Sequence, residues 1–159
     1  MSCDVAMAAY LFLASASPSG APAQTVPAVA APGPVSAEPL FIDIVSRATK
    51  LKVMTDAYGK TAGLKALPAA KPLPGFTRFE SEVAELAALD MKGHLELAAR
   101  GTDGDLKCIL RGISQDLPRK LDELEKAPSG AAQYEALRDM SYLLNDNVEV
   151  ITAPPAPPA

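Results

Sequence analysis

Residues 102–127, TDGDLKCILRGISQDLPRKLDELEKA, carry the clearest helical pattern in the chain and decide its fold class. Apolar side chains recur there every three or four residues, which places them on one stripe of an α-helix with polar side chains opposite. The stripe consists of Leu106, Ile109, Leu110, Ile113, Leu117, Leu121 and Leu124. A single helix cannot bury its own stripe, so the rest of the chain must supply partner helices.

The ends and the middle of this segment contain residues that punctuate helices. Gly101 suits the left-handed position that ends a preceding helix. Thr102 or Asp103 can cap the next helix by accepting its first free backbone N–H groups. Pro118 removes one backbone donor, so we expect a kink or a short break there, with two packed helices as the alternative.

Three further segments have a helical period, at about residues 39–58, 77–100 and 131–145. Pro39 suits the first turn of the first helix, which Ser36 can cap. Residues 145–147 (Asn-Asp-Asn) should break or fray the last helix, leaving 148–151 as a short apolar extension. The pattern therefore predicts an all-α, small four-helix bundle over residues 39–151, with its third helix kinked at Pro118.

Residues 59–75, GKTAGLKALPAAKPLPG, form a long connection between the first two helices. Their prolines and glycines argue against a continued helix. Leu64, Leu67 and Leu73 are expected to pin the connection to the core. The alternative is a mobile loop that serves as a binding segment.

Both ends of the chain are rich in Pro and Ala. Residues 1–23 contain an apolar run at 5–16 followed by small residues, as in a signal peptide, although no Lys or Arg precedes the run. We interpret residues 24–38 as a disordered linker and 152–159 as a disordered Pro-rich tail. The protein is accordingly expected in the periplasm or secreted, without a transmembrane helix after signal removal. The alternative is a cytoplasmic protein with an uncleaved N-terminus.

The net charge of −4 and the pI of about 5.0 argue against a nucleic-acid binder that relies on a basic surface. The charge is nevertheless uneven, because residues 40–75 carry six basic side chains against Asp43 and Asp56. Either these cations complement the acidic remainder of the bundle, or they form a basic patch for an acidic partner or lipid surface. The six are Arg47, Lys50, Lys52, Lys60, Lys65 and Lys71.

Asp90 and His94 interrupt the apolar stripe of the second helix, and His94 is the only histidine. At a spacing of four residues the carboxylate can orient the imidazole and favour its charged form. Three interpretations compete: a structural polar pair bonded to a neighbouring helix, a metal or haem ligand pair, and a general acid–base pair. The chain offers few companion ligands for zinc and no nucleophile pattern or phosphate-binding glycine loop.

Cys108 lies opposite the apolar stripe of its helix, and after signal removal it would be the only cysteine. It is either a covered or exposed structural residue, or a reactive thiol that can form an intermolecular disulfide. No CxxC or CxxCH motif is present, which argues against thioredoxin-like redox chemistry and covalent haem attachment.

The segment 117–140, LPRKLDELEKAPSGAAQYEALRDM, resembles the helical hairpins of small periplasmic four-helix b-type cytochromes. That resemblance implies a bundle and a C-terminal histidine ligand for haem. No histidine follows His94, so the resemblance supports the bundle and not the haem.

These features together favour a non-enzymatic exported protein that binds an unknown protein partner or self-associates, and that needs no cofactor. The alternatives are a small metal- or haem-binding bundle that uses Asp90 and His94, and a cytosolic regulatory adaptor.

Overall fold

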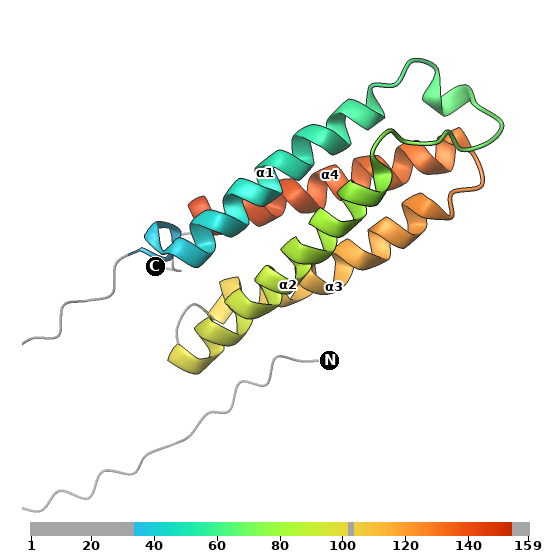
Figure 1. The fold of residues 1–159 in the computed structure, drawn as a ribbon. Coiled ribbons are helices and arrows are strands. Elements are labelled where there is room, and N and C mark those ends of the chain that lie inside the picture. The colour runs from blue at the N-terminus through green and yellow to red at the C-terminus, as the bar shows by residue number, and fades with distance from the viewer. Residues whose placement is uncertain (1–33, 102–103, 154–159) are drawn as a thin grey trace, which may run out of the picture. The chain divides into compact units, whose positions relative to one another are not determined.

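Four helices run antiparallel to their neighbours and form the predicted all-α bundle (Figure 1). The structure, a computed structural model, describes residues 34–101 and 104–153. Its helices are α1 (Pro39–Gly59), α2 (Phe76–Arg100), α3 (Gly104–Glu125) and α4 (Gly130–Thr152), with short 3-10 helices η1 (Val35–Ala37) and η2 (Leu64–Ala66). Around the bundle α1 packs on α2 and α4, while α3 packs on α2 and α4, so α2 and α4 face each other across a diagonal.

The core is built from the apolar stripes of all four helices. In α3 the stripe buries Leu106, Leu110, Ile113, Leu117, Leu121 and Leu124, as its spacing predicts, and Ile109 is half-buried. The largest fully buried side chains come three from each helix: Phe41, Ile44, Leu51, Phe79, Leu86, Leu97, Leu110, Leu117, Leu124, Leu137, Met140 and Leu144. Removal of this apolar surface from water is the main contribution that stabilises the bundle.

Helix α1 begins at Pro39, as expected, but Ser36 does not cap it. The capping position belongs to Glu38, whose side chain makes no capping hydrogen bond. The Glu38 carboxylate instead accepts two hydrogen bonds from Arg100, at 2.6 and 2.7 Å. This bidentate pair ties the start of α1 to the end of α2, where Gly101 adopts the predicted left-handed conformation with φ of 67°.

Helix α3 continues from Gly104 through Pro118 to Glu125, so the predicted break is absent. The proline leaves the carbonyl of Ser114 without its helical N–H donor, but Leu117 and Leu121 on either side stay buried. Packing of the stripe therefore outweighs the local cost of the proline. The predicted capping residues Thr102 and Asp103 lie outside the described residues.

Helix α4 is longer than its sequence suggests. Ser129 caps it by accepting a hydrogen bond from the backbone N–H of Ala132 at 3.2 Å. The helix then runs to Thr152 instead of ending at Asn145, so the predicted break at residues 145–147 is wrong. Asn147 is completely buried and Ile151 packs in the core, so the apolar run that was expected to be a separate extension belongs to the helix.

The connection between α1 and α2 is fixed to α4. Leu64 is buried, and the backbone N–H of Gly130 donates to the carbonyl of Leu67 at 3.1 Å. Gln133 donates to the carbonyl of Lys71 at 2.7 Å and accepts from its backbone N–H at 3.0 Å. A Cβ at Gly130 would overlap the Leu64 carbonyl, so the approach requires glycine. The expectation that leucines pin this connection is met, because Leu64 is buried and Leu67 and Leu73 are partly buried against the core.

No helix within residues 34–101 and 104–153 combines the length and the apolar character needed to cross a bilayer. The predicted signal peptide (1–23), most of the linker (24–38) and most of the tail (152–159) lie outside the described residues.

Candidate functional site: a buried polar pair and the outer face of α4

Two buried polar residues, Asp90 of α2 and Asn147 of α4, are hydrogen-bonded to each other. The Asn147 amide nitrogen donates to Oδ2 of Asp90 at 2.9 Å, and both residues are completely buried. The bond joins the two helices that face each other across the diagonal. Burial raises the pKa of Asp90 from 3.8 to about 8, against the opposing effect of the Asn147 hydrogen bond.

His94 is directed to a different helix from Asp90. Its Nδ1 lies 2.7 Å from the backbone carbonyl oxygen of Lys107 in α3, so Nδ1 carries a proton and donates it to that carbonyl. The two residues share a face of α2 by their spacing, but their hydrogen bonds go to α4 and α3 respectively. Within residues 34–101 and 104–153, no cluster of three His, Cys, Asp or Glu side chains could hold a metal ion.

Cys108 is not a free thiol in this structure. It is half-buried on α3. The other cysteine of the sequence, Cys3, lies outside the described residues.

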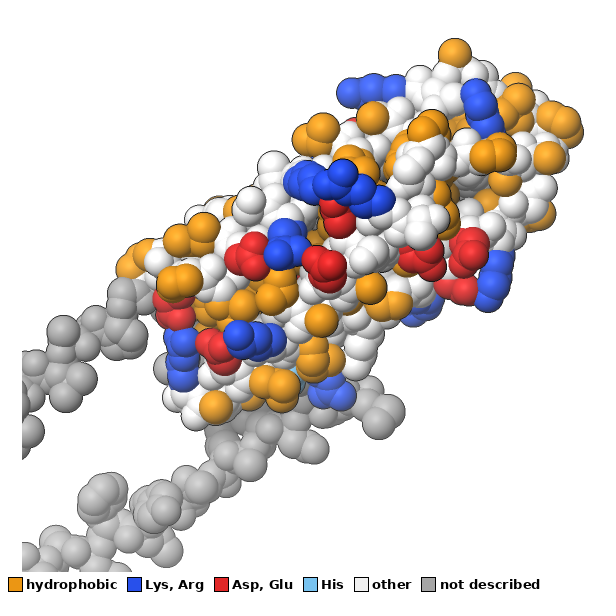
Figure 2. All heavy atoms as spheres, viewed as in Figure 1, with side chains coloured by type: hydrophobic (Ala, Val, Ile, Leu, Met, Phe, Trp, Pro, Cys, Tyr) orange, Lys and Arg blue, Asp and Glu red, His pale blue; other side chains and the backbone are white. Residues whose placement is uncertain are grey.

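Most of the six cations proposed as a basic patch are engaged within the bundle. Arg47 contacts Asp43 at 2.9 Å and Glu85 at 2.8 Å, and Lys50 contacts Glu82 at 2.8 Å. The contacts with Glu85 and Glu82 join α1 to α2. In the view of Figure 2, the basic side chains over the middle of the molecule accordingly lie against acidic ones.

The other four cations are dispersed rather than gathered. Lys52 pairs with Asp56 at 2.9 Å, and the ammonium of Lys65 lies 3.9 Å from the ring centroid of Tyr134. Lys60 and Lys71 make no ion pair with another described residue, and they lie in different hollows of the surface. The arrangement agrees with charge complementation between α1 and the acidic remainder of the bundle.

The outer face of α4 carries an exposed aromatic side chain between two hollows. Tyr142 has a relative exposure of 65% and lines two separate hollows, one on each side of α4. The α1–α4 hollow has a volume of about 330 Å³ and is lined by Thr55, Asp56, Gly59, Lys60, Tyr134, Leu137, Arg138, Ser141 and Tyr142. The α3–α4 hollow has a volume of about 220 Å³ and is lined by Asp116, Lys120, Asp139, Tyr142, Leu143 and Asp146. We call Tyr142 and these two hollows the Tyr142 face.

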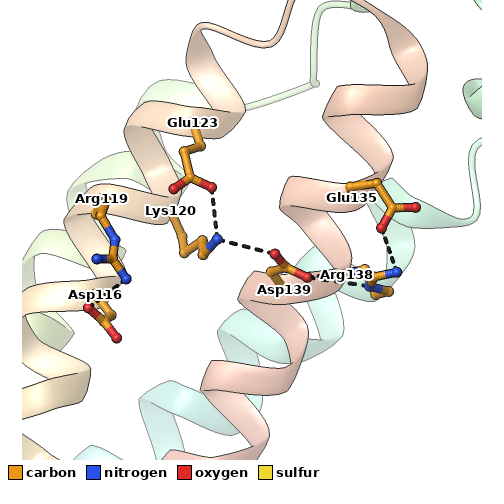
Figure 3. Close-up of polar contacts among 7 residues, drawn as sticks. All are labelled: Asp116, Arg119, Lys120, Glu123, Glu135, Arg138 and Asp139. Atoms are coloured by element: carbon orange, nitrogen blue, oxygen red, sulfur yellow. Dashed lines mark hydrogen bonds and ion pairs between the residues drawn. The ribbon is translucent and has the colours of Figure 1, made fainter.

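Ion pairs fix the side chains around the Tyr142 face. Lys120 of α3 contacts both Glu123 and, across the helix boundary, Asp139 of α4, at 2.8 and 3.1 Å (Figure 3). Asp139 also accepts from Arg138, which is held on its other side by Glu135 (Figure 3). Burial acts to raise the pKa of Asp139, but the hydrogen bonds from Arg138 and Lys120 outweigh it and hold the pKa below its usual value. Asp139 therefore remains a carboxylate at neutral pH.

On the other side of α4, the hydroxyl of Ser141 donates to Oδ1 of Asp56, whose Oδ2 accepts from Lys52. Burial acts to raise the pKa of Asp56, but these hydrogen bonds and the nearby lysines lower it overall. The carboxylate is therefore a weak base, which does not suit activation of the Ser141 hydroxyl as a nucleophile. The arrangement suits binding better than acid–base chemistry.

The sequence interpretation missed Asn147 and the Tyr142 face. Asn147 continues the buried spacing of Met140, Leu144 and Ile151, which was the one signal that it faces the core. Tyr134, Arg138, Tyr142 and Asp146 follow one another at four-residue intervals on α4, which could have marked them as one strip. Their juxtaposition with Lys60 and Asp56 of α1 follows only from the tertiary structure.

No family model matches this chain, and comparisons with the curated proteins and with solved structures give no match either.

Proposed function

We propose that this protein is a non-enzymatic helical interaction protein that binds a protein partner through the Tyr142 face. The observation that carries the proposal is the exposed ring of Tyr142 between two hollows. Tyrosine and arginine contribute most to binding where an anchoring side chain is surrounded by contacts that exclude water. Tyr134, Arg138 and Tyr142 supply such side chains along one strip of α4.

The ion pairs at this face support the proposal because they position its side chains before a partner arrives. Arg138 is held by Glu135 and Asp139, and Lys120 links α3 to α4. Side chains that are already ordered lose less conformational entropy on binding. Each pair is too exposed to add much to folding stability, so positioning is the larger consequence.

The location of Asp90 favours binding over catalysis. A strongly shifted carboxyl group is a typical acid–base candidate when it lies in a cleft. Asp90 has no exposed surface, and neither Asp90 nor His94 lines either hollow of the Tyr142 face. A substrate therefore has no access to this carboxyl group in the folded structure.

The connection between α1 and α2 offers a second surface, but its backbone is already bonded to α4 through Gly130 and Gln133. A segment held in this way does not act as a mobile binding loop. We therefore place recognition on the Tyr142 face and not on residues 59–75.

Co-purification from the host tests the proposal with two variants and one matched control. Tyr142→Ala and Arg138→Ala should each lower recovery of the bound partner at least tenfold, as expected for anchoring residues. Leu95→Ala removes a side chain of similar exposure, 59%, from α2 and should leave recovery unchanged. If all three variants retain the partner equally, the Tyr142 face is not the binding surface.

Self-association is a separate outcome of the same proposal, because the partner can be a second copy of this chain. Sedimentation of the purified protein distinguishes the two cases. A dimer that Tyr142→Ala dissociates identifies self-association, and a monomer under the same conditions requires a different protein as partner.

We further propose that the protein acts in the periplasm or outside the cell. Its support is the apolar run at residues 5–16, which ends in small residues at 14–16 and is followed by small residues at 21–23. The intact mass of protein purified from its host tests this location. A mass lowered by removal of a leader ending near residue 16 or 23 supports export, whereas the mass of the full chain contradicts it.

A further inference from the structure

Asp90 and Asn147 form a buried pair that links α2 to α4. The proposed binding function does not involve this pair. Asp90 and Asn147 are each completely buried and share one hydrogen bond, from the Asn147 amide to Oδ2 of Asp90. The other oxygen of each group, Oδ1 of Asp90 and Oδ1 of Asn147, has no hydrogen-bond partner. Two acceptors without donors therefore belong to the same two side chains.

The number of hydrogen-bond donors in this pair indicates the protonation state of Asp90. An ionised carboxylate has acceptors only, and the Asn147 amide group supplies the only donors in the pair. Exchanging the amide oxygen and nitrogen of Asn147 does not help, because the amide oxygen would then face a carboxylate oxygen. A proton on Oδ1 of Asp90 supplies the missing hydrogen-bond donor. Oδ1 of Asn147, which has no donor of its own, is the acceptor for it.

We infer that Asp90 is an uncharged carboxylic acid in the folded protein and forms a reciprocal acid–amide pair with Asn147, and that this pair is a pH-sensitive clasp between α2 and α4. Each group then donates one hydrogen bond and accepts one. The pair satisfies its own polar atoms, as buried polar groups generally must.

The surroundings of Asp90 agree with an uncharged state. The influences on its pKa are burial and the Asn147 hydrogen bond, and no charged side chain of α1, α3 or α4 contributes. On α2 itself the nearest titratable neighbour on the same face is His94, which donates to the Lys107 carbonyl of α3. Burial raises the pKa of Asp90 to about 8, so the carboxyl group holds its proton at neutral pH.

Ionisation weakens the clasp. Loss of the proton removes one of the two reciprocal hydrogen bonds and leaves a charge in the core without a cation beside it. In the unfolded chain the carboxyl group ionises near its ordinary pKa of 3.8. The folded state therefore binds one more proton than the unfolded state between about pH 4 and 8, so stability falls as the pH rises through that window.

A carbon-detected NMR titration of the full-length, ¹³C-labelled protein tests the protonation state without any substitution. The side-chain carboxyl carbon of Asp90 should keep the shift of an uncharged acid at pH 6 and titrate with a midpoint near pH 8. A midpoint near pH 4 would overturn the inference.

Urea unfolding at pH 6 and pH 9 tests the clasp. The midpoint of the wild type should fall between these pH values by clearly more than that of Asp90→Asn, which keeps a reciprocal amide–amide pair but cannot ionise. Asp146→Asn removes an exposed carboxylate of α4 and should behave like the wild type. An equal fall in all three proteins overturns the clasp, and the titration decides the protonation state if Asp90→Asn does not fold.

Discussion

At the scale of single residues, Asn147 explains both the length of α4 and the environment of Asp90. Asparagine is a poor helix former and the run of three polar residues at 145–147 is typical of a helix end. The bond of Asn147 to Asp90 and the burial of Ile151 outweigh that local preference. A polar contact within the core thus extends the helix by two turns.

A double-mutant cycle at these two positions measures their interaction. Asn147→Ala should lower the free energy of unfolding by about 2 kcal/mol or more, because it leaves Asp90 buried without a partner. Adding Asp90→Ala removes that unpaired group, so the double variant should lose less than the sum of the single losses, by about 1 kcal/mol or more. Chemical denaturation of the four proteins at pH 6 gives the values. Additive losses would show that the two residues do not interact.

The sequence suggested that Asp90 and His94 are polar residues bonded to a neighbouring helix, which their bonds to α4 and α3 agree with, but it did not identify Asn147 as the partner of Asp90. Spacing within one helix reveals contacts only on that helix, and it suggested His94 as the partner of Asp90. The actual partner lies 57 residues further along the chain. A contact of that separation depends on how α2 and α4 are placed across the bundle, which the periodicity of neither helix specifies.

At the scale of elements, the apolar stripes were sufficient to predict the four helices. The stripe of α3 holds its phase on both sides of Pro118, and burial of Leu117 and Leu121 keeps the helix continuous. The ends of the helices, by contrast, depended on contacts between one element and another. Glu38 binds Arg100 at the end of α2, and the connection after α1 is fastened to Gly130 and Gln133 of α4.

Gly130→Ala tests that fastening. A Cβ at residue 130 would overlap the Leu64 carbonyl, so η2 must move, and the variant should lose about 2 kcal/mol or more of stability. Gly112→Ala is the matched control within α3, where a Cβ meets no atom within 4 Å, and it should gain up to about 1 kcal/mol. Thermal unfolding of both variants compares them. Equal melting temperatures would mean that the connection does not depend on this approach.

At the scale of the whole molecule, α4 is the helix through which the other parts of the bundle are connected. It packs against α1, α3, η1 and η2, and its buried Asn147 reaches across to α2. Its remaining face carries Tyr142 between the two hollows. The sequence predicted the bundle as a whole, but surfaces made jointly by α4 with α1 and α3 required the helices to be placed next to one another.

Site-specific photo-crosslinking tests the central claim, that the Tyr142 face binds a partner, most directly. A photoreactive phenylalanine derivative is placed in the full chain at position 142 and, in a separate protein, at position 95 of α2, whose side chain is similarly exposed. After irradiation in the host, we expect a discrete adduct from position 142 and none from position 95. An adduct from position 95 alone, or none from position 142, would contradict the central claim.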